Sequence, residues 1–329
     1  MAPNRRSRMR WATPMSDSAL IIGEALVDIV ERPDGTVSSH PGGSPANVAL
    51  GLARLGRSVD LLTSLGDDEH GKLVRDHVTA SGVRLAPSRT ANATSIAKAR
   101  LDDTGAATYD FTLAWDLEEA AAPDAGTRVV HTGSIAAVLE PGATTVHELI
   151  SAARSHATIT YDPNARPALM GDTAAARRRV EELVALADVV KVSDEDIAWL
   201  APGEEILEVA AAWRLLGPAI VVVTRGAEGA IAFANCGIVS VSPAPVAVVD
   251  TVGAGDSFMS GLIDGLWEAG VLGAEQRGAL ADISDTSLRE VLERCSRIAG
   301  ITVSRAGANP PTREELGEAP LKSESRRSV

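Results

Sequence analysis

Cysteine is scarce in this sequence: Cys236 and Cys295 are the only two among 329 residues. They form no CxxC pair and stand near no histidine cluster, so neither a disulfide framework nor a structural zinc site is expected. The low cysteine count favours a reducing, cytoplasmic location. No run reaches about 18 apolar residues, which argues against a transmembrane helix and a membrane partner.

An excess of positive charge is also missing, because the formal net charge is −13. Nothing broad and basic is present to neutralise the phosphates of a nucleic acid or an anionic membrane. A small anionic ligand stays possible, since a local site can hold it against the overall charge. The basic segment 1–18 is expected to be a disordered extension, with an organellar presequence or a start at Met15 as alternatives. Segment 316–329 is expected to be a polar tail.

Apolar runs that alternate with helical patterns dominate the rest of the chain. The runs cover residues 19–30, 58–66, 127–134, 157–164, 187–194 and 218–226. Between the first two, "SPANVALGLARLG" (44–56) predicts a helix in which Ser44 can cap the start. Such alternation predicts an α/β fold, in which a mostly parallel sheet is covered by helices on both faces to give three layers. Ligands bind at the carboxyl ends of such strands, where the sequence places Asp28, Asp162, Asn164, Ser193 and Thr224.

Two segments break this alternation. Residues about 31–41 and 94–115 alternate between apolar and polar side chains and have no helical pattern between their short strands. We expect them to form a small antiparallel β lid over the strand ends. With the lid inserted, residues 19–315 are expected to form one domain.

The stretch "DTVGAGDSFMSGLIDGL" (250–266) is the most informative motif. Gly253 and Gly255 let the backbone approach a ligand closely, and the helix that follows has unpaired N–H groups at its positive end. This geometry suits a phosphoryl group. Asp256 is either a plain helix-start acid that complements the dipole or a general base that takes a proton from the attacking hydroxyl.

A second motif, "PGGSPANVALGLARLG" (41–56), has a Gly-Gly entry into a helix. Gly42 and Gly43 allow another close approach of the backbone, and Asn47 falls in the first helical turn, where its amide can face the same cleft. The alternative is a capped helix with an ordinary glycine entry.

Together the two motifs resemble the two signatures of the ribokinase-like (PfkB) family of carbohydrate kinases, and the resemblance covers about residues 19–315. It implies a ribokinase-like domain with a β-stranded lid. It also implies that the protein phosphorylates a sugar or nucleoside hydroxyl with ATP and Mg²⁺. Small-molecule sugar and ATP are therefore the expected partners, and the open strand edges of the lid make a homodimer through the lid conceivable.

The resemblance also assigns roles to single residues. Asp256 matches the catalytic base. The anion hole matches the amides of Gly253, Ala254, Gly255 and Asp256. The sugar-binding positions match Asp28, Gly42, Gly43 and Asn47. The nucleotide site matches Thr224, Gly226 and Gly229. The monovalent-cation ligands match Asp250 and the carbonyl groups of Val252, Thr302, Arg305 and Gly307.

This sequence departs from the family pattern at the magnesium motif. The family often carries Asn-x-x-Glu, and Ser193 and Asp196 stand at the matching positions. Mg²⁺ keeps several of its waters in most protein sites, so a contact from Asp196 through water is still expected. Pro311 stands where a side-chain hydroxyl sometimes serves the monovalent cation, which leaves a weaker K⁺ site.

Four stretches point to the substrate. "GEALVDIV", "GGSPANVALGLARLG", "DPNARP" and "KVSDEDIAWL" look most like bacterial fructokinases, which makes D-fructose the expected substrate. The "DPNARP" stretch is shared with 2-keto-3-deoxygluconate kinases, and in it Asn164 and Arg166 are further substrate-binding candidates. A ribokinase or nucleoside kinase stays an alternative, although aromatic residues, at 3%, offer little surface for a base.

Two other classes of function fit less well. A binding protein on the same fold would favour loss of Asp256 or of the glycines, and both are present. A nicotinamide-dependent oxidoreductase needs a glycine fingerprint after the first strand, which "IIGEALVDIV" does not supply. The run "GDDEHGKL" (66–73) has the spacing of a phosphate-binding loop, but Leu73 replaces the required hydroxyl residue.

Overall fold

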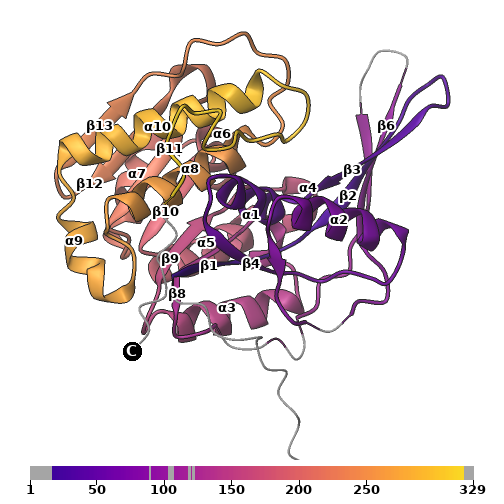
Figure 1. Ribbon diagram of the computed structural model, residues 1–329, viewed down its shortest axis with the longest axis horizontal. Coiled ribbons are helices and arrows are strands. Elements are labelled where there is room, and N and C mark those ends of the chain that lie inside the picture. The colour runs from indigo at the N-terminus through magenta and orange to yellow at the C-terminus, as the bar shows by residue number, and fades with distance from the viewer. Residues whose placement is uncertain (1–16, 89, 103–106, 118–119, 121–122, 322–329) are drawn as a thin grey trace, which may run out of the picture.

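The structure is a computed structural model that describes residues 17–321 except 89, 103–106, 118–119 and 121–122. Most of the basic extension predicted for residues 1–18 therefore lies outside the described residues, as does the tail from residue 322. Two sheets and their helices make up the described chain (Figure 1).

Within the described residues, the larger sheet has nine strands in the order β13-β12-β11-β10-β9-β8-β1-β4-β5. All neighbouring pairs are parallel except β11–β12 and β12–β13. This confirms the expected mostly parallel sheet. The strands are β1 (Ser18–Ile22), β4 (Ser58–Leu62), β5 (Arg84–Leu85), β8 (Thr127–Gly133), β9 (Thr158–Asp162), β10 (Val189–Ser193), β11 (Ile220–Thr224), β12 (Ala230–Ala234) and β13 (Gly237–Val241).

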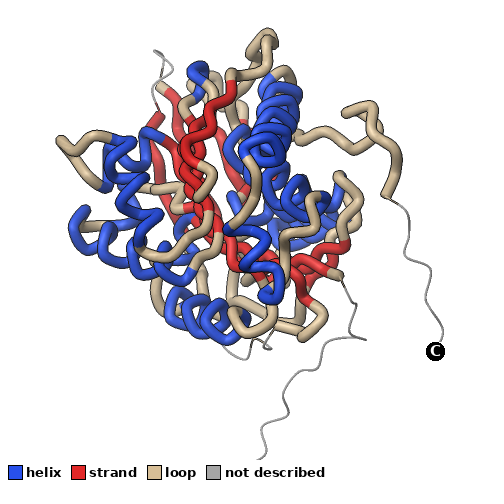
Figure 2. The backbone as a smooth tube through the Cα atoms, turned by 90° about the vertical axis from the view of Figure 1, so that its left-hand side faces the viewer, coloured by secondary structure: helices blue, strands red, loops and turns tan. Residues whose placement is uncertain are grey.

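Helices cover both faces of this sheet, which gives the three expected layers (Figure 2). One core lies under α1 (Ser44–Arg54), α2 (Glu69–Ala80), α8 (Ala254–Glu268), α9 (Arg277–Ala281) and α10 (Asp285–Val303). The other core lies under α3 (Gly142–Ala153), α5 (Thr173–Leu186), α6 (Asp194–Leu200) and α7 (Ile206–Leu215). Strand residues contribute alternately to the two cores, as Val189 and Val190 of β10 do, because successive side chains point to opposite faces. A short α4 (Pro167–Met170) and three 3-10 turns, η1 (Ser134–Ala137), η2 (Gly226–Glu228) and η3 (Ala274–Gln276), complete the described elements.

The second sheet is the predicted lid, and it projects from the body in Figure 1. Its order is β3-β2-β6-β7, with β2 (Leu26–Glu31), β3 (Val37–Gly42), β6 (Ser95–Leu101) and β7 (Ala107–Thr112). The pairs β2–β3 and β6–β7 are antiparallel, but β2 and β6 are parallel. The lid is therefore a mixed sheet rather than a wholly antiparallel one.

The apolar run 19–30 is not one strand, as its pattern suggested. β1 ends at Ile22 in the large sheet, and β2 starts at Leu26 in the lid. At the break, an added Cβ on Gly23 would lie 2.2 Å from Cγ of Pro45, so the chain turns close against the start of α1. The run looks continuous because residues 18–27 are buried on both sides of the break.

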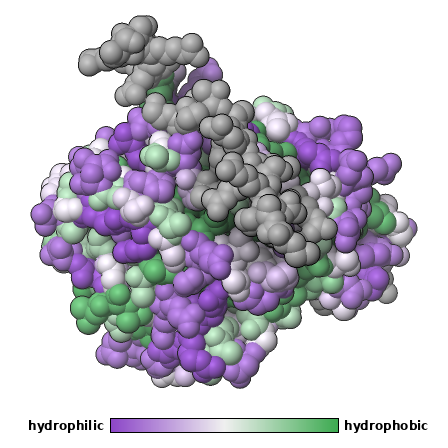
Figure 3. Space-filling model, turned by 90° about the horizontal axis from the view of Figure 1, so that it is seen from below, coloured by the Kyte–Doolittle hydropathy of each residue, from purple (hydrophilic) through white to green (hydrophobic). Residues whose placement is uncertain are grey.

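One face of the described molecule is largely polar. Hydrophilic side chains cover most of the described face in Figure 3, and the hydrophobic ones are scattered among them. Among the described residues, no helix combines the length and apolar character needed to cross a membrane.

Candidate active site

The starts of α1 and α8 lie side by side at the carboxyl edge of the large sheet. The two helices pack closely, because an added Cβ on Gly51 of α1 would lie 2.4 Å from Oγ of Ser260 of α8. The motifs 41–56 and 250–266, about two hundred residues apart in sequence, therefore meet in one site.

Asp256 lies in the first turn of α8 and is buried, with 8% of its surface exposed. Its Oδ1 accepts a hydrogen bond from the Ser44 hydroxyl (2.6 Å), and its Oδ2 accepts one from the Asn47 amide (2.8 Å). Two donors, one on each oxygen, hold the carboxylate in a fixed plane. Each oxygen still has a free lone pair to accept a proton.

Ser44 therefore has a different role from the predicted one. Gly43 is the N-cap of α1, with φ 102°, and Ser44 is the first helical residue. Its hydroxyl turns to Asp256 rather than capping its own helix. Gly43 is required here, because an added Cβ would lie 2.5 Å from the carbonyl oxygen of Glu24.

The turn before Asp256 carries the residues that the sequence predicts to form an anion hole. Gly253 is the N-cap of α8 in the left-handed conformation, with φ 75°. The amide of Ala254 donates to the carbonyl of Thr251 (3.2 Å), so it is the amide least free for a ligand. The amides of Gly255 and Asp256 fall in the first helical turn, where a helix supplies no acceptor.

Beneath this turn lies a buried ion pair whose role the sequence did not suggest. Nζ of Lys191 donates to Oδ2 of Asp162 at 2.9 Å, and an added Cβ on Gly255 would lie 2.8 Å from that Nζ. Burial lowers the pKa of Lys191, but the carboxylates of Asp162, Asp196 and Asp256 raise it above its ordinary value. Burial raises the pKa of Asp162 to about 6, while Lys191 lowers it. A cation is thus held against the first turn of α8.

Asp28 lies on β2 and brings the lid to the site. An added Cβ on Gly42 would lie 2.0 Å from Oδ2 of Asp28, so glycine at this position makes room for the carboxylate. Burial raises the pKa of Asp28 above its ordinary value, although Arg166 and His40 oppose the rise. Arg166, which follows β9, is therefore among the charged groups that surround Asp28.

Asn164 and Arg166 form a small unit after β9. Asn164 has φ 37°, an uncommon left-handed value for a residue other than glycine. Nη1 of Arg166 donates to Oδ1 (2.8 Å) and to the carbonyl oxygen (3.0 Å) of Asn164. The exposed guanidinium is thus partly fixed by its neighbour.

Ser193, from the magnesium motif, and Thr224, from the predicted nucleotide site, are the last residues of β10 and β11, and Gly226 and Gly229 lie in the turn after β11. Ser193 lies opposite Thr224 in the parallel pair, so the two strand ends are adjacent. Gly226 and Gly229 have φ values of 48° and 84°, which favour glycine. An added Cβ on Gly229 would lie 2.1 Å from the carbonyl oxygen of Val241.

Asp196, the predicted magnesium residue, is already bonded within the protein. Its Oδ1 accepts from the amide of Ala165 (2.9 Å), and its Oδ2 accepts from the amide of Ser193 (3.4 Å) in a capping box. Among the described residues, no group of three or more His, Cys, Asp or Glu side chains could hold a metal ion. The arrangement leaves Asp196 able to bind the water of a hydrated ion rather than to help enclose a bare one.

The loop at Asp250 meets the segment after α10. Oδ1 of Asp250 accepts from the amide of Val252 (3.0 Å) and Oδ2 from the amide of Gly307 (2.8 Å), and these bonds lower the pKa of Asp250. The carbonyl of Thr302 accepts from the amide of Arg305 (3.1 Å). The predicted cation ligands therefore lie in the loop at Asp250, in the last turn of α10 and in the segment that follows it.

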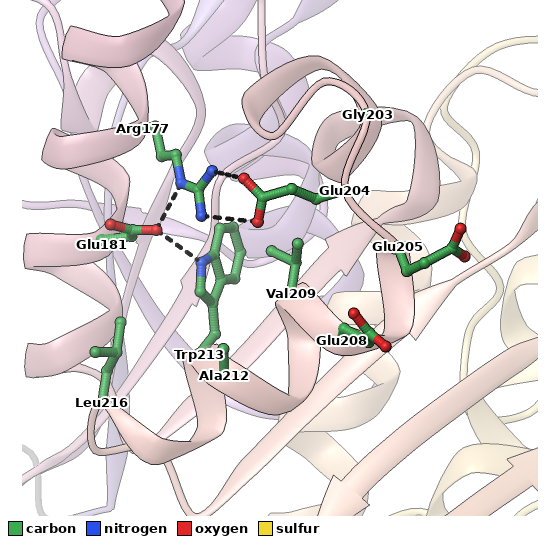
Figure 4. A pocket seen from close by; sticks show the side chains of 10 residues that line it. All are labelled: Arg177, Glu181, Gly203, Glu204, Glu205, Glu208, Val209, Ala212, Trp213 and Leu216. Atoms are coloured by element: carbon green, nitrogen blue, oxygen red, sulfur yellow. Dashed lines mark hydrogen bonds and ion pairs between the residues drawn. The ribbon is translucent and has the colours of Figure 1, made fainter.

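A separate pocket of about 560 Å³ lies between α5 and α7 (Figure 4). Arg177 crosses it, paired with Glu181 and Glu204, and the Trp213 indole donates to Glu181. None of the predicted site residues lines it.

Comparison with known proteins gives one family match and many relatives. The model of the family described as pfkB family carbohydrate kinase matches residues 16–315. A fructokinase from Rhizobium leguminosarum bv. trifolii is 33% identical over 282 residues, which cover 82% of this chain and 85% of that protein. A fructokinase from Klebsiella pneumoniae is 34% identical over 267 residues, which cover 78% of this chain and 87% of that protein.

The fold is also similar to solved structures. The crystal structure of a fructokinase with bound ATP from Xylella fastidiosa has a TM-score of 0.78 and 25% sequence identity to this chain. The similarity covers 92% of this chain and 98% of that one.

Proposed function

Because this chain belongs to the pfkB family of carbohydrate kinases, we propose that it transfers the γ-phosphoryl group of ATP to the 6-hydroxyl of D-fructose. The observation that carries the proposal is the buried Asp256 carboxylate, which Ser44 and Asn47 orient at the start of α8. The choice of fructose rests on the relatives, which are named fructokinases, and the choice of ATP is supported by the ATP bound in the Xylella fastidiosa enzyme.

In this proposal, the start of α8 both binds the phosphoryl group and accepts a proton. The amides of Gly253, Gly255 and Asp256 hold the transferring phosphoryl group, and the positive end of the helix favours its negative charge. The carboxylate of Asp256 takes the proton of the attacking sugar hydroxyl as the oxygen–phosphorus bond forms. Lys191 adds a buried positive charge against the same turn. Positioning and charge stabilisation are what phosphoryl transfer mainly requires.

The lid and the start of α1 supply the sugar contacts. Asp28 on β2 is an acceptor for sugar hydroxyls, and Gly42 and Gly43, which have no side chains, leave the backbone open to the ring. Asn47 would contact the sugar while its amide holds Asp256. Closure of the lid excludes water, which Asp256 would otherwise activate to hydrolyse ATP without a sugar.

The site's donors also fit the expected ions. The carboxylate of Asp196, fixed by two amides, suits a water of Mg²⁺, an ion that supplies positive charge to the nucleotide phosphates. The ionised Asp250 suits K⁺ with four carbonyl groups, from Val252, Thr302, Arg305 and Gly307. A cation there supplies positive charge beside the loop that leads into the anion hole. Ser193, Thr224, Gly226 and Gly229 would contact the nucleotide.

One observation favours a second candidate, the phosphorylation of 2-keto-3-deoxygluconate. The positive charge of Arg166 acts on Asp28, so a sugar acid in the same cleft would find a cation for its carboxylate. Arg166→Ala should then abolish activity on the sugar acid and leave activity on fructose nearly unchanged.

A panel assay tests the proposal. ADP release is measured with fructose, ribose, 2-keto-3-deoxygluconate and adenosine, each with ATP and Mg²⁺, and the phosphorylated product is identified. The proposal expects the highest kcat/KM with fructose. Turnover that no sugar stimulates would overturn it, and a preference for the sugar acid would establish the second candidate.

A further inference from the structure

Two of the connections between the lid and the body meet at one turn. The chain first enters the lid at Glu24, between β1 and β2, and leaves it for the last time at Trp115, three residues after β7; in between it returns to the body from α1 to β5. Oε2 of Glu24 accepts a hydrogen bond from the amide of Ala136 (3.2 Å). Nε1 of Trp115 donates to the carbonyl oxygen of Ala136 (3.0 Å). The two peptide groups of Ala136 in η1 thus hold the first entry into the lid and the last exit from it.

These contacts are built into the interior. Glu24 and Trp115 are only 4% and 5% exposed, and Ala136 is fully buried. The Ser134 hydroxyl donates to the Glu24 carboxylate, and Ser134 has the left-handed φ of 54°. A buried polar group that loses its partner destabilises the arrangement by more than the net value of the bond, so each bond resists being broken.

The exit crossing is held from a second side. Trp115 packs against the start of α3, where an added Cβ on Gly142 would lie 2.3 Å from its Nε1. The amide of Gly142 also donates to the carbonyl of Trp115 (3.3 Å). The indole therefore has little freedom to turn away from Ala136.

The entry crossing reaches both halves of the proposed active site. The carbonyl oxygen of Glu24 lies directly beneath Gly43, and the next residue, Ser44, holds Asp256. In the other direction the chain continues into β2, which carries Asp28. A shift of Glu24 would therefore change the position of Asp28 relative to Asp256.

We propose that Glu24 and Trp115 are positioning residues. By gripping the two sides of Ala136, they fix the angle of the lid and so the distance between the sugar-binding Asp28 and the base Asp256. The effect of these residues on the reaction rests on the proposed kinase function, but the two hydrogen bonds to Ala136, here called the clamp, are present in the free protein. Loss of the clamp should weaken sugar binding more than it slows phosphoryl transfer.

Two substitutions test the clamp. Trp115→Phe keeps the ring and removes the donor, and Glu24→Met keeps the length of the side chain and removes the acceptor. Each should raise KM for the sugar about threefold to tenfold, the usual value of one hydrogen bond, with KM for ATP and kcat changed less. The double variant should raise KM by less than the product of the two, because both bonds act on Ala136. Glu24→Gln keeps an acceptor and should restore KM.

Trp213→Phe is the matched control, since Trp213 is equally buried and its indole donates to Glu181 in the core under α7. It should lower stability and leave KM for the sugar unchanged. If Trp115→Phe and Glu24→Met behave like this control, the residues are only structural and the proposal is wrong.

Amide hydrogen exchange keeps the test independent of turnover. In the free protein, Trp115→Phe should speed exchange in β2, β3, β6 and β7 several-fold relative to Trp213→Phe. Unchanged exchange in the lid would overturn the clamp even if the protein is a fructokinase. Faster exchange of the lid amides in Trp115→Phe, in a protein that phosphorylates no sugar, would support the clamp and show that only the proposed function is wrong.

Discussion

Gly253→Ala is the substitution that tests the anion hole most sharply. Gly253 is the N-cap of α8 and has φ 75°. A left-handed conformation costs a residue with a Cβ roughly 1–2 kcal/mol. The new Cβ would also lie 2.6 Å from Cβ and 2.9 Å from Cα of Ala308. The substitution therefore adds both backbone strain and overlap with the segment after α10.

The overlap sets the expected size of the effect. Carbon atoms in contact lie about 3.5–4.0 Å apart, so Gly253 and Ala308 must separate by about 1 Å. A misplacement of about 1 Å at a reacting centre can cost about 10²-fold in rate. Gly253→Ala should therefore lower kcat about a hundredfold and lower the free energy of unfolding by at least about 1–2 kcal/mol.

Gly270→Ala is the matched control. Gly270 follows the other end of α8 with φ 72°, and nothing lies within 4 Å of an added Cβ. It should lose the same 1–2 kcal/mol from backbone strain and keep wild-type kcat. Urea unfolding and steady-state kinetics with ATP and fructose measure both quantities. If Gly253→Ala loses stability like Gly270→Ala and keeps full activity, the turn does not hold the phosphoryl group.

Three further outcomes are expected. Ser44→Ala removes one of the two donors that orient Asp256 and should lower kcat about tenfold. Ser260→Ala removes a buried hydroxyl that donates to the Ser257 carbonyl and should leave kcat unchanged. Equal losses of kcat in the two variants would contradict the role of Ser44. Burial raises the pKa of Glu24 to about 7 from an ordinary 4.5, so the unfolded chain loses this proton first as pH rises. Glu24 should therefore remove about 3 kcal/mol of stability between about pH 4.5 and 7, and urea unfolding of Glu24→Gln should lack that fall. Asp28→Ala should raise KM for the sugar at least tenfold and leave KM for ATP unchanged, a pattern that steady-state kinetics would refute if both constants rose together.

Sequence patterns predicted the parts of the fold that depend on local order. Apolar runs and helical periods were enough for the large sheet and its two helical layers, because each element buries one face or both. The break at 23–25 could not be seen, since a buried run has the same composition whether it forms one strand or two. The parallel pairing of β2 with β6 could not be seen either, because it depends on how distant segments meet.

In the candidate site, too, local features could be predicted from the sequence and contacts between distant segments could not. The glycines before Asp256 and the Gly42-Gly43 entry are local signals, and the structure brings these two motifs together. The bond from Ser44 to Asp256 joins residues 212 positions apart and follows only from the packing of α1 on α8. Lys191 had one usable signal, a charged residue inside the apolar run of β10. Its partner Asp162 is set by the pairing of β9 with β10.

The most direct test of the account is the turnover of Asp256→Asn with fructose and ATP, measured beside ATP affinity. Asparagine keeps the size of the side chain but cannot take the hydroxyl proton. The account predicts that kcat falls about 10²–10⁴-fold, while the dissociation constant for ATP stays within a few-fold of the wild type. A variant that phosphorylates fructose at the wild-type rate would contradict the assignment of Asp256 as the base.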